Sequence, residues 1–475
     1  MSRYTGVTDE DLRAMLGAIG VDSLEELFAD IPESVRLGRE IDLPPGRSEQ
    51  EVYEHLAALA GRNRSTEEEV TFLGAGMYDH YVPALIDTLL SRSEFLTPYT
   101  PYQPEISQGG LQVMFEFQTA ISELTGLPVA NASVYEGPSA VAAAGYLAKL
   151  ETKRAKLVAS RGLHPHSRAA LVTHAAGYAM EVVEVPLDDE GYTEVEGLAA
   201  AVDDDTAAVF VQQPNFLGTV EELGPLVEAG KRTGAMLVCA ADPIPLSILK
   251  PPGAFGVDLC VGEGQTLGNR LDFGGPSFGF FAADERFIRK MPGRIAGETH
   301  DVDGRRGFVL TLQTREQHIR REKATHNICT AQALNALAGV VYLSWLGKRG
   351  FVELGELLLR RTHYAREALG LEAINPGPVV REFAVRVPDL DSAIARARDA
   401  GINPGYPLRR DFPEFSDGLL IAVTERRTKE HIDRLAAVIT GEPAESRPAV
   451  APAAASSAGA ASSTRAPSPP TGVRV

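Results

Sequence analysis

The central part of the chain alternates between two kinds of segment. Short apolar or β-branched runs are separated by longer segments whose apolar positions recur at helical spacing. Near-continuous apolar strands that alternate with helices indicate a mostly parallel sheet covered on both faces. The predicted strands are Val129–Val134, Lys156–Ser160, Met180–Leu187, Ala207–Gln212, Ala235–Ala240, Val257–Val261 and Ser277–Ala282. The predicted helices include Gly137–Leu150, His166–Gly177 and Val220–Thr233. The fold class is therefore α/β, and we expect residues 69–325 to form its large domain.

The flanking regions have different patterns. Residues 1–68 are predicted to form a helical N-terminal arm, because Thr8 with Asp11, and Ser23 with Glu26, have the spacing of helix N-caps. Residues 326–441 are predicted to form a linking helix and a small C-terminal α/β domain. Its predicted elements are Ile328–Gly347, Val380–Pro388, Asp389–Ala400, Gly418–Thr424 and Lys429–Ile439. Residues 442–475 are rich in Ala, Ser and Pro and lack periodicity, so we expect a disordered tail.

One predicted helix raises the question of a membrane. Ile328–Gly347 contains no charged residue and is about as long as a bilayer-spanning helix. It also contains Thr330, Gln332, Asn335 and Ser344, and no second span follows it. We therefore expect a long helix buried between layers, in a protein that does not enter the membrane.

Charge and cysteine content narrow the functional classes further. Lys and Arg total 46 and Asp and Glu total 64, which gives a net charge of −18. Such an excess of acidic residues disfavours nucleic acid and anionic membrane surfaces as partners. The three cysteines, Cys239, Cys260 and Cys329, have no close spacing. They favour a cytoplasmic location and argue against a disulfide framework or a zinc site.

The segment Gly262–Gly275 reads G-E-G-Q-T-L-G-N-R-L-D-F-G-G and follows the predicted strand Val257–Val261. It has no G-K-[ST] and leads into another strand, so nucleotide-binding motifs fit it poorly. It resembles the turn in which one large family of pyridoxal-phosphate enzymes keeps its aldehyde-binding lysine, and here that position is Gln265. A carboxamide nitrogen is delocalised into its carbonyl and cannot form a Schiff base.

A second motif is the strip Phe95–Gly110, F-L-T-P-Y-T-P-Y-Q-P-E-I-S-Q-G-G. Its prolines recur every three residues, as in a stiff polyproline-like turn. Ser107 is expected to cap a helix that runs to about Thr125. Two interpretations stay open: a rigid finger that places aromatic and amide groups in a pocket, its own or a neighbour's, or an ordinary surface loop.

Three predicted strand ends carry polar groups. Glu136-Gly137 begins a helix whose N-terminus suggests a phosphate site, but the charge of Glu136 opposes a phosphate and favours a structural turn. His164 and His166 flank a proline, and without a third ligand we favour hydrogen-bonded histidines over a metal site. Asp242 follows another strand, where it could pair with a protonated ring nitrogen or cap a turn.

Taken together, several long motifs resemble the P-protein family of the glycine cleavage system. The resemblance is to subunit 1 of the two-chain form of glycine dehydrogenase (decarboxylating), and it runs from about Tyr4 to about Gly441. The motifs are T-D-E-D-L-R-A-M-L at 8–16, F-L-G-A-G-M-Y-D-H-Y-V-P at 72–83, the strip at 97–105, N-A-S-V-Y-E-G at 131–137 and G-E-G-Q-T-L-G at 262–268.

This resemblance implies a pyridoxal-phosphate-dependent transferase fold of type I, like aspartate aminotransferase, and a homologous second subunit whose lysine holds the cofactor. The implied partners are that subunit, the lipoyl-carrying H-protein, the T- and L-proteins and glycine. Asp242 matches the acid that contacts the ring nitrogen in the competent subunit, and Gln265 takes the place of the lysine. Both are therefore expected to be vestigial cofactor-site positions, and no residue of this chain is expected to be catalytic. The candidates for reaching a shared pocket are Tyr99, Tyr102, Gln103, Glu105, Ser107 and Gln108.

Three functions follow as hypotheses. The first is a lysine-free subunit of glycine decarboxylase, inactive alone, that supports a site on its partner. The second is a self-sufficient pyridoxal-phosphate enzyme that uses Lys250, the one rival lysine near the predicted loop end of the sheet. The third is a scaffold or regulatory subunit that retains the fold without chemistry.

Overall fold

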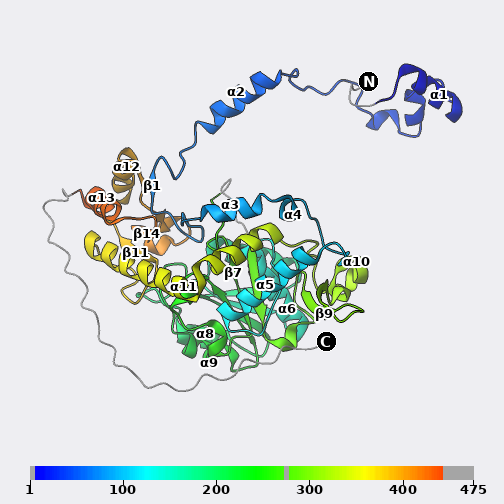
Figure 1. The fold of residues 1–475 in the computed structure, drawn as a ribbon. Coiled ribbons are helices and arrows are strands. Elements are labelled where there is room, and N and C mark those ends of the chain that lie inside the picture. The colour runs from blue at the N-terminus through cyan, green and yellow to red at the C-terminus, as the bar shows by residue number, and fades with distance from the viewer. Residues whose placement is uncertain (1–5, 272–277, 442–475) are drawn as a thin grey trace. The chain divides into compact units, whose positions relative to one another are not determined.

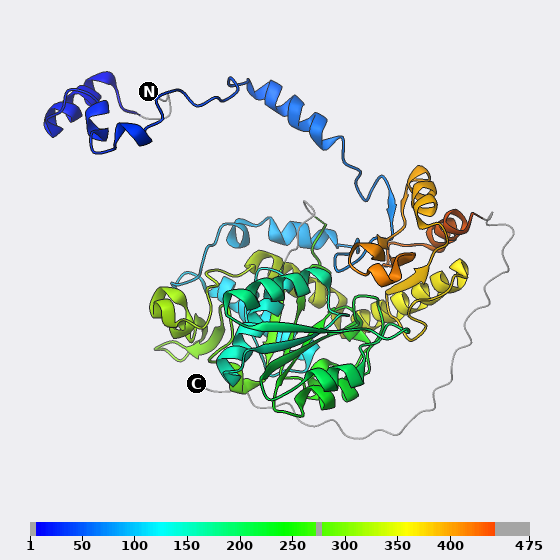
Figure 2. The same ribbon diagram turned by 180° about the vertical axis from the view of Figure 1, so that it is seen from behind.

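The computed structural model describes residues 6–271 and 278–441 (Figures 1 and 2). The predicted tail and Ser277 lie outside these ranges. The chain forms two compact units, Met1–Arg64 and Ser65–Val475. Each is described by itself, and the domain boundaries predicted from sequence stay predictions.

The first unit contains the helices α1 (Asp9–Ile19) and α2 (Glu49–Ala60). The predicted Thr8–Asp11 cap of α1 is confirmed as a reciprocal capping box. The Ser23–Glu26 prediction is wrong as a start of a longer helix, because only the four-residue 3₁₀ turn Glu25–Phe28 forms there, although the two side chains do bond at 3.1 Å. A capping box formed by Ser48 and Glu51 starts α2 instead.

The second unit is built on a seven-stranded sheet with the order β2-β8-β7-β6-β5-β3-β4. Strands β4, β3, β5, β6 and β7 run parallel, whereas β8 is antiparallel to both β7 and β2. The mostly parallel α/β sheet predicted from the sequence is therefore confirmed. The strands are β2 (Val129–Ala130), β3 (Lys156–Ser160), β4 (Glu181–Val185), β5 (Thr206–Gln213), β6 (Met236–Ala241), β7 (Leu259–Glu263) and β8 (Gly279–Ala283).

Two predicted strands are shorter than their apolar runs. The run from Val129 forms only two residues of strand, because the Asn131 side chain accepts from the Ser133 N–H and Ser133 takes a positive φ of 96°. Such a local side-chain turn competes with strand pairing. Strand β4 ends before Pro186, which has no N–H to donate to the ladder.

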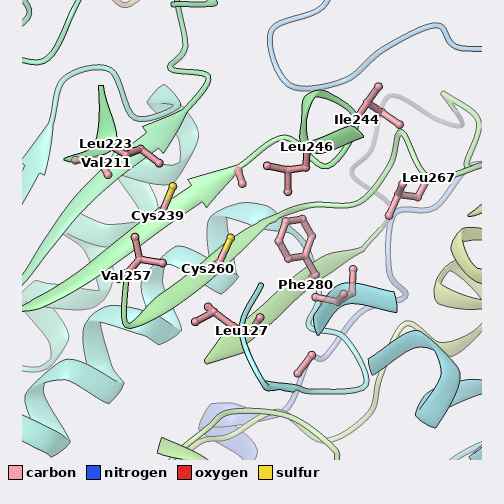
Figure 3. Close-up of a cluster of buried hydrophobic side chains, with 14 of the residues drawn as sticks. Leu127, Val211, Leu223, Cys239, Ile244, Leu246, Val257, Cys260, Leu267 and Phe280 are labelled. Atoms are coloured by element: carbon pink, nitrogen blue, oxygen red, sulfur yellow. The ribbon is translucent and has the colours of Figure 1, made fainter. Parts of the chain in front are cut away.

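Helices cover both faces of the sheet. They are α5 (Gln108–Thr125), α6 (Gly137–Thr152), α7 (Pro165–Gly177), α8 (Val195–Ala201) and α9 (Leu223–Lys231). Alternate strand residues point to opposite faces. Val209, Cys239 and Cys260 belong to one apolar cluster, whereas Ala208 and Val238 belong to the cluster on the other face. Figure 3 shows Cys239, Cys260 and Phe280 pointing into the first cluster from neighbouring strands.

The long helix α11 (Ala333–Leu369) differs from the predicted Ile328–Gly347 at both ends. Residues before Ala333 are irregular, and the chain turns at Gly347 with φ 61° before it continues as a second helix. A glycine tolerates that backbone conformation at little cost, so the helical pattern resumes beyond it. No helix in the described ranges is long and apolar enough to cross a membrane.

A smaller antiparallel sheet follows, formed by β11 (Glu382–Arg386), β14 (Gly418–Ala422) and β13 (Tyr406–Pro407). The helices α12 (Leu390–Asp399) and α13 (Lys429–Thr440) agree with the predicted ones. Strand β1 (Val70–Thr71) pairs with β12 (Ile402–Asn403), and Phe72 lies in the C-terminal apolar cluster. This segment, which the sequence pattern assigned to the large domain, thus pairs with a strand of the C-terminal part of the chain.

Two short helices and a hairpin that the sequence did not predict complete the second unit. The helices α3 (Ala84–Leu90) and α4 (Ser93–Leu96) precede the proline-tyrosine strip. The hairpin of β9 (Ala296–His300) and β10 (Arg306–Leu310) packs against α5 and is followed by α10 (Gln317–Arg320).

Gly218 joins the large sheet to the small one by close approach. Its φ is +89°, and a Cβ there would clash with the carbonyl oxygen of Glu382. Gly234 has a similar φ of +76° but open space around it.

We predict that Gly234→Ala lowers the free energy of unfolding by about 1 kcal/mol, the cost of a left-handed alanine, and that Gly218→Ala lowers it by more. Thermal unfolding of both variants measures this. Equal losses would contradict the proposed backbone contact.

Candidate functional site

A cavity of about 250 Å³ lies at the carboxyl ends of β5, β6 and β7, where open α/β sheets usually bind ligands. The described residues that line it include no lysine. Its walls come from the strand ends, from the segment 75–78 and from the start of β11. Five polar side chains decide its chemistry: Tyr78, Asp242, Glu263, Arg381 and Glu382.

Gln265 is fully buried beside this cavity, and its side-chain amide bonds to two other parts of the chain. Its carbonyl oxygen accepts the N–H of Tyr78 at 2.9 Å, and its amide nitrogen donates to the carbonyl of Tyr78 at 3.0 Å. The same nitrogen donates to the carbonyl of Asn269 at 2.8 Å. The amide therefore ties the turn after β7 to the segment that carries Tyr78.

Asp242 lines the cavity, but its carboxylate is already paired within the chain. Its carboxylate accepts from Nε of Arg381 at 2.6 Å and forms an ion pair with that guanidinium. The guanidinium carbon of Arg381 lies 3.5 Å from the centroid of the Tyr78 ring. Burial raises the pKa of Asp242, and the charge of Arg381 opposes that shift. The acid at this strand end is thus neutralised by a residue of the same chain.

Glu382 completes this network from β11. One oxygen accepts from the Tyr78 hydroxyl at 2.5 Å and the other from the N–H of Ala75 at 2.6 Å. Burial is the main cause that raises the pKa of Glu382 to about 7, while those hydrogen bonds oppose the shift.

The N-terminus of α6 is capped by two carboxylates. Glu136 accepts the N–H of Ser139 at 3.1 Å, and Glu263 accepts the N–H of Gly137 at 2.9 Å. These N–H groups are the ones that would bind a phosphate at a helix N-terminus. The geometry supports the structural interpretation of the Glu136-Gly137 turn, because the available donors already meet negative charge.

The first histidine of the H-P-H motif is bonded to backbone through both ring nitrogens. The Nε2 of His164 lies 2.9 Å from the carbonyl of Ala75, and its Nδ1 accepts from the N–H of His166 at 3.1 Å. Burial lowers the pKa of His164 to about 4, so the ring is neutral near pH 7. With both ring nitrogens engaged, His164 has no lone pair left for a metal.

Lys250 is exposed and does not line the cavity. Its Nζ lies 4.4 Å from the centroid of the Phe255 ring. This position offers nothing to the hypothesis of a Schiff base on Lys250 in the cavity.

The six strip candidates lie elsewhere, and none of them lines the cavity. Tyr99 is 78% exposed, and Gln103 and Glu105 are exposed beside it. Tyr102 and Gln108 are bonded to other parts of the chain. Ser107 takes the N-cap position of α5, but the predicted cap is wrong in detail, because its side chain makes no capping hydrogen bond.

A family model described as glycine cleavage system P-protein matches residues 2–439. The chain belongs to the glycine cleavage system P-protein family. It is 51% identical, over 93% of its length and 100% of the relative, to a probable glycine dehydrogenase (decarboxylating) subunit 1 of Carboxydothermus hydrogenoformans. A protein of the same description from Geobacillus kaustophilus is 50% identical over 91% of this chain and 98% of the relative.

Solved structures give the same assignment. A crystal structure of glycine decarboxylase (P-protein) in inhibitor-bound form matches with a TM-score of 0.82 and 42% identity, and covers 93% of this chain and 100% of that one. A cysteine desulfurase from Escherichia coli matches with a TM-score of 0.58 at 12% identity, over 79% of this chain and 95% of that one. This second likeness concerns the fold alone, and it confirms the type I pyridoxal-phosphate fold predicted from the sequence.

The residues of this cavity do not fit the cofactor that the fold implies. Gln265, which by resemblance takes the place of the lysine, bonds through its amide to both backbone groups of Tyr78. The helix N-terminus that would hold a phosphate is capped by Glu136 and Glu263. The acid that would pair with a ring nitrogen is held by Arg381. An anionic phosphate ester in this cavity would meet carboxylates where it needs donors.

Sequence reasoning found Gln265 and Asp242 but missed Arg381, Glu382 and Tyr78. The sequence did contain a signal for Arg381 and Glu382, because V-V-R-E-F places two adjacent charges in a buried strand pattern. Charges in such a position need partners, and therefore mark a network.

We predict that restoring a lysine does not restore the cofactor site. In Gln265→Lys the hydrogen bonds of the amide to Tyr78 are lost, while Glu136 and Glu263 still cap α6. Titration of the single chain with pyridoxal phosphate should give no saturable imine absorbance. Gln265→Met, which removes the same hydrogen bonds without adding an amine, is the control for the drop in melting temperature. A stoichiometric imine in Gln265→Lys would contradict this account.

Glu382 should make stability depend on pH. Because its folded pKa of about 7 exceeds the ordinary value of 4.5, the protonated carboxyl stabilises the fold below about pH 4.5, and this contribution is lost as pH rises to about 7. The melting temperature of Glu382→Gln should therefore fall less over this pH interval than that of the unmodified chain. Parallel pH profiles for the two proteins would refute the assignment.

Proposed function

We propose that this chain is the lysine-free subunit of glycine decarboxylase and that it completes a cofactor site on a homologous partner. The observation that carries the proposal is the state of its own cavity: the three positions needed for the cofactor are occupied by hydrogen bonds and ion pairs within the chain. The relatives that it matches along nearly their whole length are described as subunit 1 of glycine dehydrogenase (decarboxylating).

In this proposal pyridoxal phosphate is bound by a lysine of the second subunit, where it acts as the electron sink for loss of carbon dioxide from glycine. The aminomethyl group then passes to the lipoyl arm of the H-protein, and the T- and L-proteins of the same system are further expected partners. No covalent step falls to a residue of this chain. Asp242 and Gln265 keep structural roles, because each now holds a neighbouring segment in place.

The part of this chain that serves the partner is the strip that contains Tyr99, Gln103 and Glu105. Their side chains are exposed and lie outside the cavity of their own chain, which supports an action on another chain. A phenol, an amide and a carboxylate on a proline-stiffened segment can orient a small zwitterion and exclude water at a neighbouring site.

A cytosolic location is part of the proposal, because the chain has no paired cysteine: Cys239, Cys260 and Cys329 are all free. Nucleic acid is not among the expected partners, given the net charge of −18.

We predict that the chain alone releases no carbon dioxide from glycine and that it does so when mixed with its partner subunit and the H-protein. In the complex, Tyr99→Phe and Gln103→Ala should each lower turnover by about fivefold or more, the value of one lost hydrogen bond. The matched control is Gln112→Ala, because Gln112 is an exposed glutamine on α5 that bonds to Glu116. Activity of the lone chain would end the proposal. Unchanged turnover in both strip variants would favour the scaffold hypothesis.

A further inference from the structure

The strip Phe95–Gly110 is not a free loop, because the buried Arg294 is bonded to it at Tyr102. Nη2 of Arg294 donates to the Tyr102 hydroxyl at 2.7 Å, and the guanidinium carbon lies 4.9 Å from the centre of the Tyr102 ring. The ring of His318 meets the same tyrosine edge-on, with 5.7 Å between ring centroids. Tyr102 is thus held from two sides, although it is 45% exposed.

Arg294 is itself held in place by its contacts with other groups. It is 1% exposed, forms an ion pair with the buried Glu316 and donates to the carbonyl of Cys329. Nδ1 of His318 lies 3.3 Å from the same carboxylate. Since a buried ion pair allows little movement of its members, the position of the Tyr102 ring is set by the interior of the large domain.

A second attachment lies six residues further along the chain. The side chain of Gln108 bonds to both backbone groups of Phe308 in β10: it accepts the N–H at 2.8 Å and donates to the carbonyl at 2.9 Å. It also donates to the carbonyl of Pro104 at 2.7 Å, so it closes the turn that contains that proline.

Between the two attachments the chain is exposed. Ile106 is 80% exposed, Gln103 and Glu105 are exposed, and the backbone turns through bonds of Ile106 to Gln103 and Ser107 to Pro104. An exposed segment that is anchored at both ends has little conformational freedom left to lose on binding. The attachments therefore prepare the tip for a fixed geometry before any partner is present.

We propose that Tyr102, Gln108 and Arg294 are positioning residues that hold the tip 103–107 in the geometry that enters the partner's site. This rests on the proposed function and divides the six strip candidates into two groups. Tyr99, Gln103 and Glu105 reach the neighbouring site. The polar groups of Tyr102 and Gln108 are hydrogen-bonded within their own chain, so these two residues affect the neighbouring site only by positioning the tip.

Two substitutions test the attachments without breaking the buried ion pair. Tyr102→Phe removes the hydroxyl but leaves Arg294 bonded to Glu316 and Cys329. Gln108→Ala removes the bonds to Phe308 at the exposed first turn of α5. In the full-length chain without its partner, amide hydrogen exchange over residues 99–107 should accelerate about tenfold in both variants, with an unchanged melting temperature. Gln112→Ala should leave this exchange unchanged. Equal exchange in all proteins would overturn the inference.

The same variants are then measured in the complex with saturating partner subunit and H-protein. Turnover should fall about tenfold for Tyr102→Phe and for Gln108→Ala, because a mobile tip is placed correctly for less of the time. Tyr102→Phe combined with Arg294→Lys should cost little more than Arg294→Lys alone, since both act through one hydrogen bond. Faster exchange with unchanged turnover, or full additivity in the double variant, would refute the positioning role.

Failure of this inference differs from failure of the proposed function. If Tyr99→Phe lowers turnover while the attachment variants do not, only the positioning role is lost. If the lone chain decarboxylates glycine, the proposed function is lost, whatever the exchange rates show.

Discussion

Hydrogen bonds from one buried amide, that of Gln265, hold together the segment over the cavity and the turn after β7. Two of them pair with both backbone groups of Tyr78, as a neighbouring strand would. This fixes the Tyr78 ring where the guanidinium of Arg381 covers it and where its hydroxyl donates to Glu382. Gln265, which by resemblance takes the place of the lysine of a pyridoxal-phosphate enzyme, thus has a structural task here.

The electrostatics of the cavity follow from the same replacement. A cofactor site of this fold needs donors for a phosphate and an acid for a ring nitrogen, and this chain uses both for itself. Glu136 and Glu263 take the helix N–H groups, and Arg381 takes the carboxylate of Asp242. Buried polar groups must be paired, and these side chains find their partners within the chain itself. The fold is therefore stable in this cavity without any contribution from a bound ligand.

The sequence predicted the large sheet well because its central strands, such as β6, are continuous apolar runs, and it located Gln265 because a lysine was missing from a recognisable turn. It failed where the decisive contacts are far apart in the chain. Gln108 and Phe308 are separated by 200 residues, and Tyr102 and Arg294 by 192, so no local pattern reports their bonds. The continuation of α11 beyond Gly347 was also missed, because Lys348 and Arg349 end the charge-free run at the residue where the backbone turns.

The central claim is that the covalent chemistry of the complex resides on the other subunit. Its most direct test is borohydride reduction of the complex, assembled with pyridoxal phosphate, followed by mass mapping of both chains. The account predicts a pyridoxyl adduct on a lysine of the partner and none on this chain. A stoichiometric adduct on any lysine of this chain, Lys250 included, would contradict it.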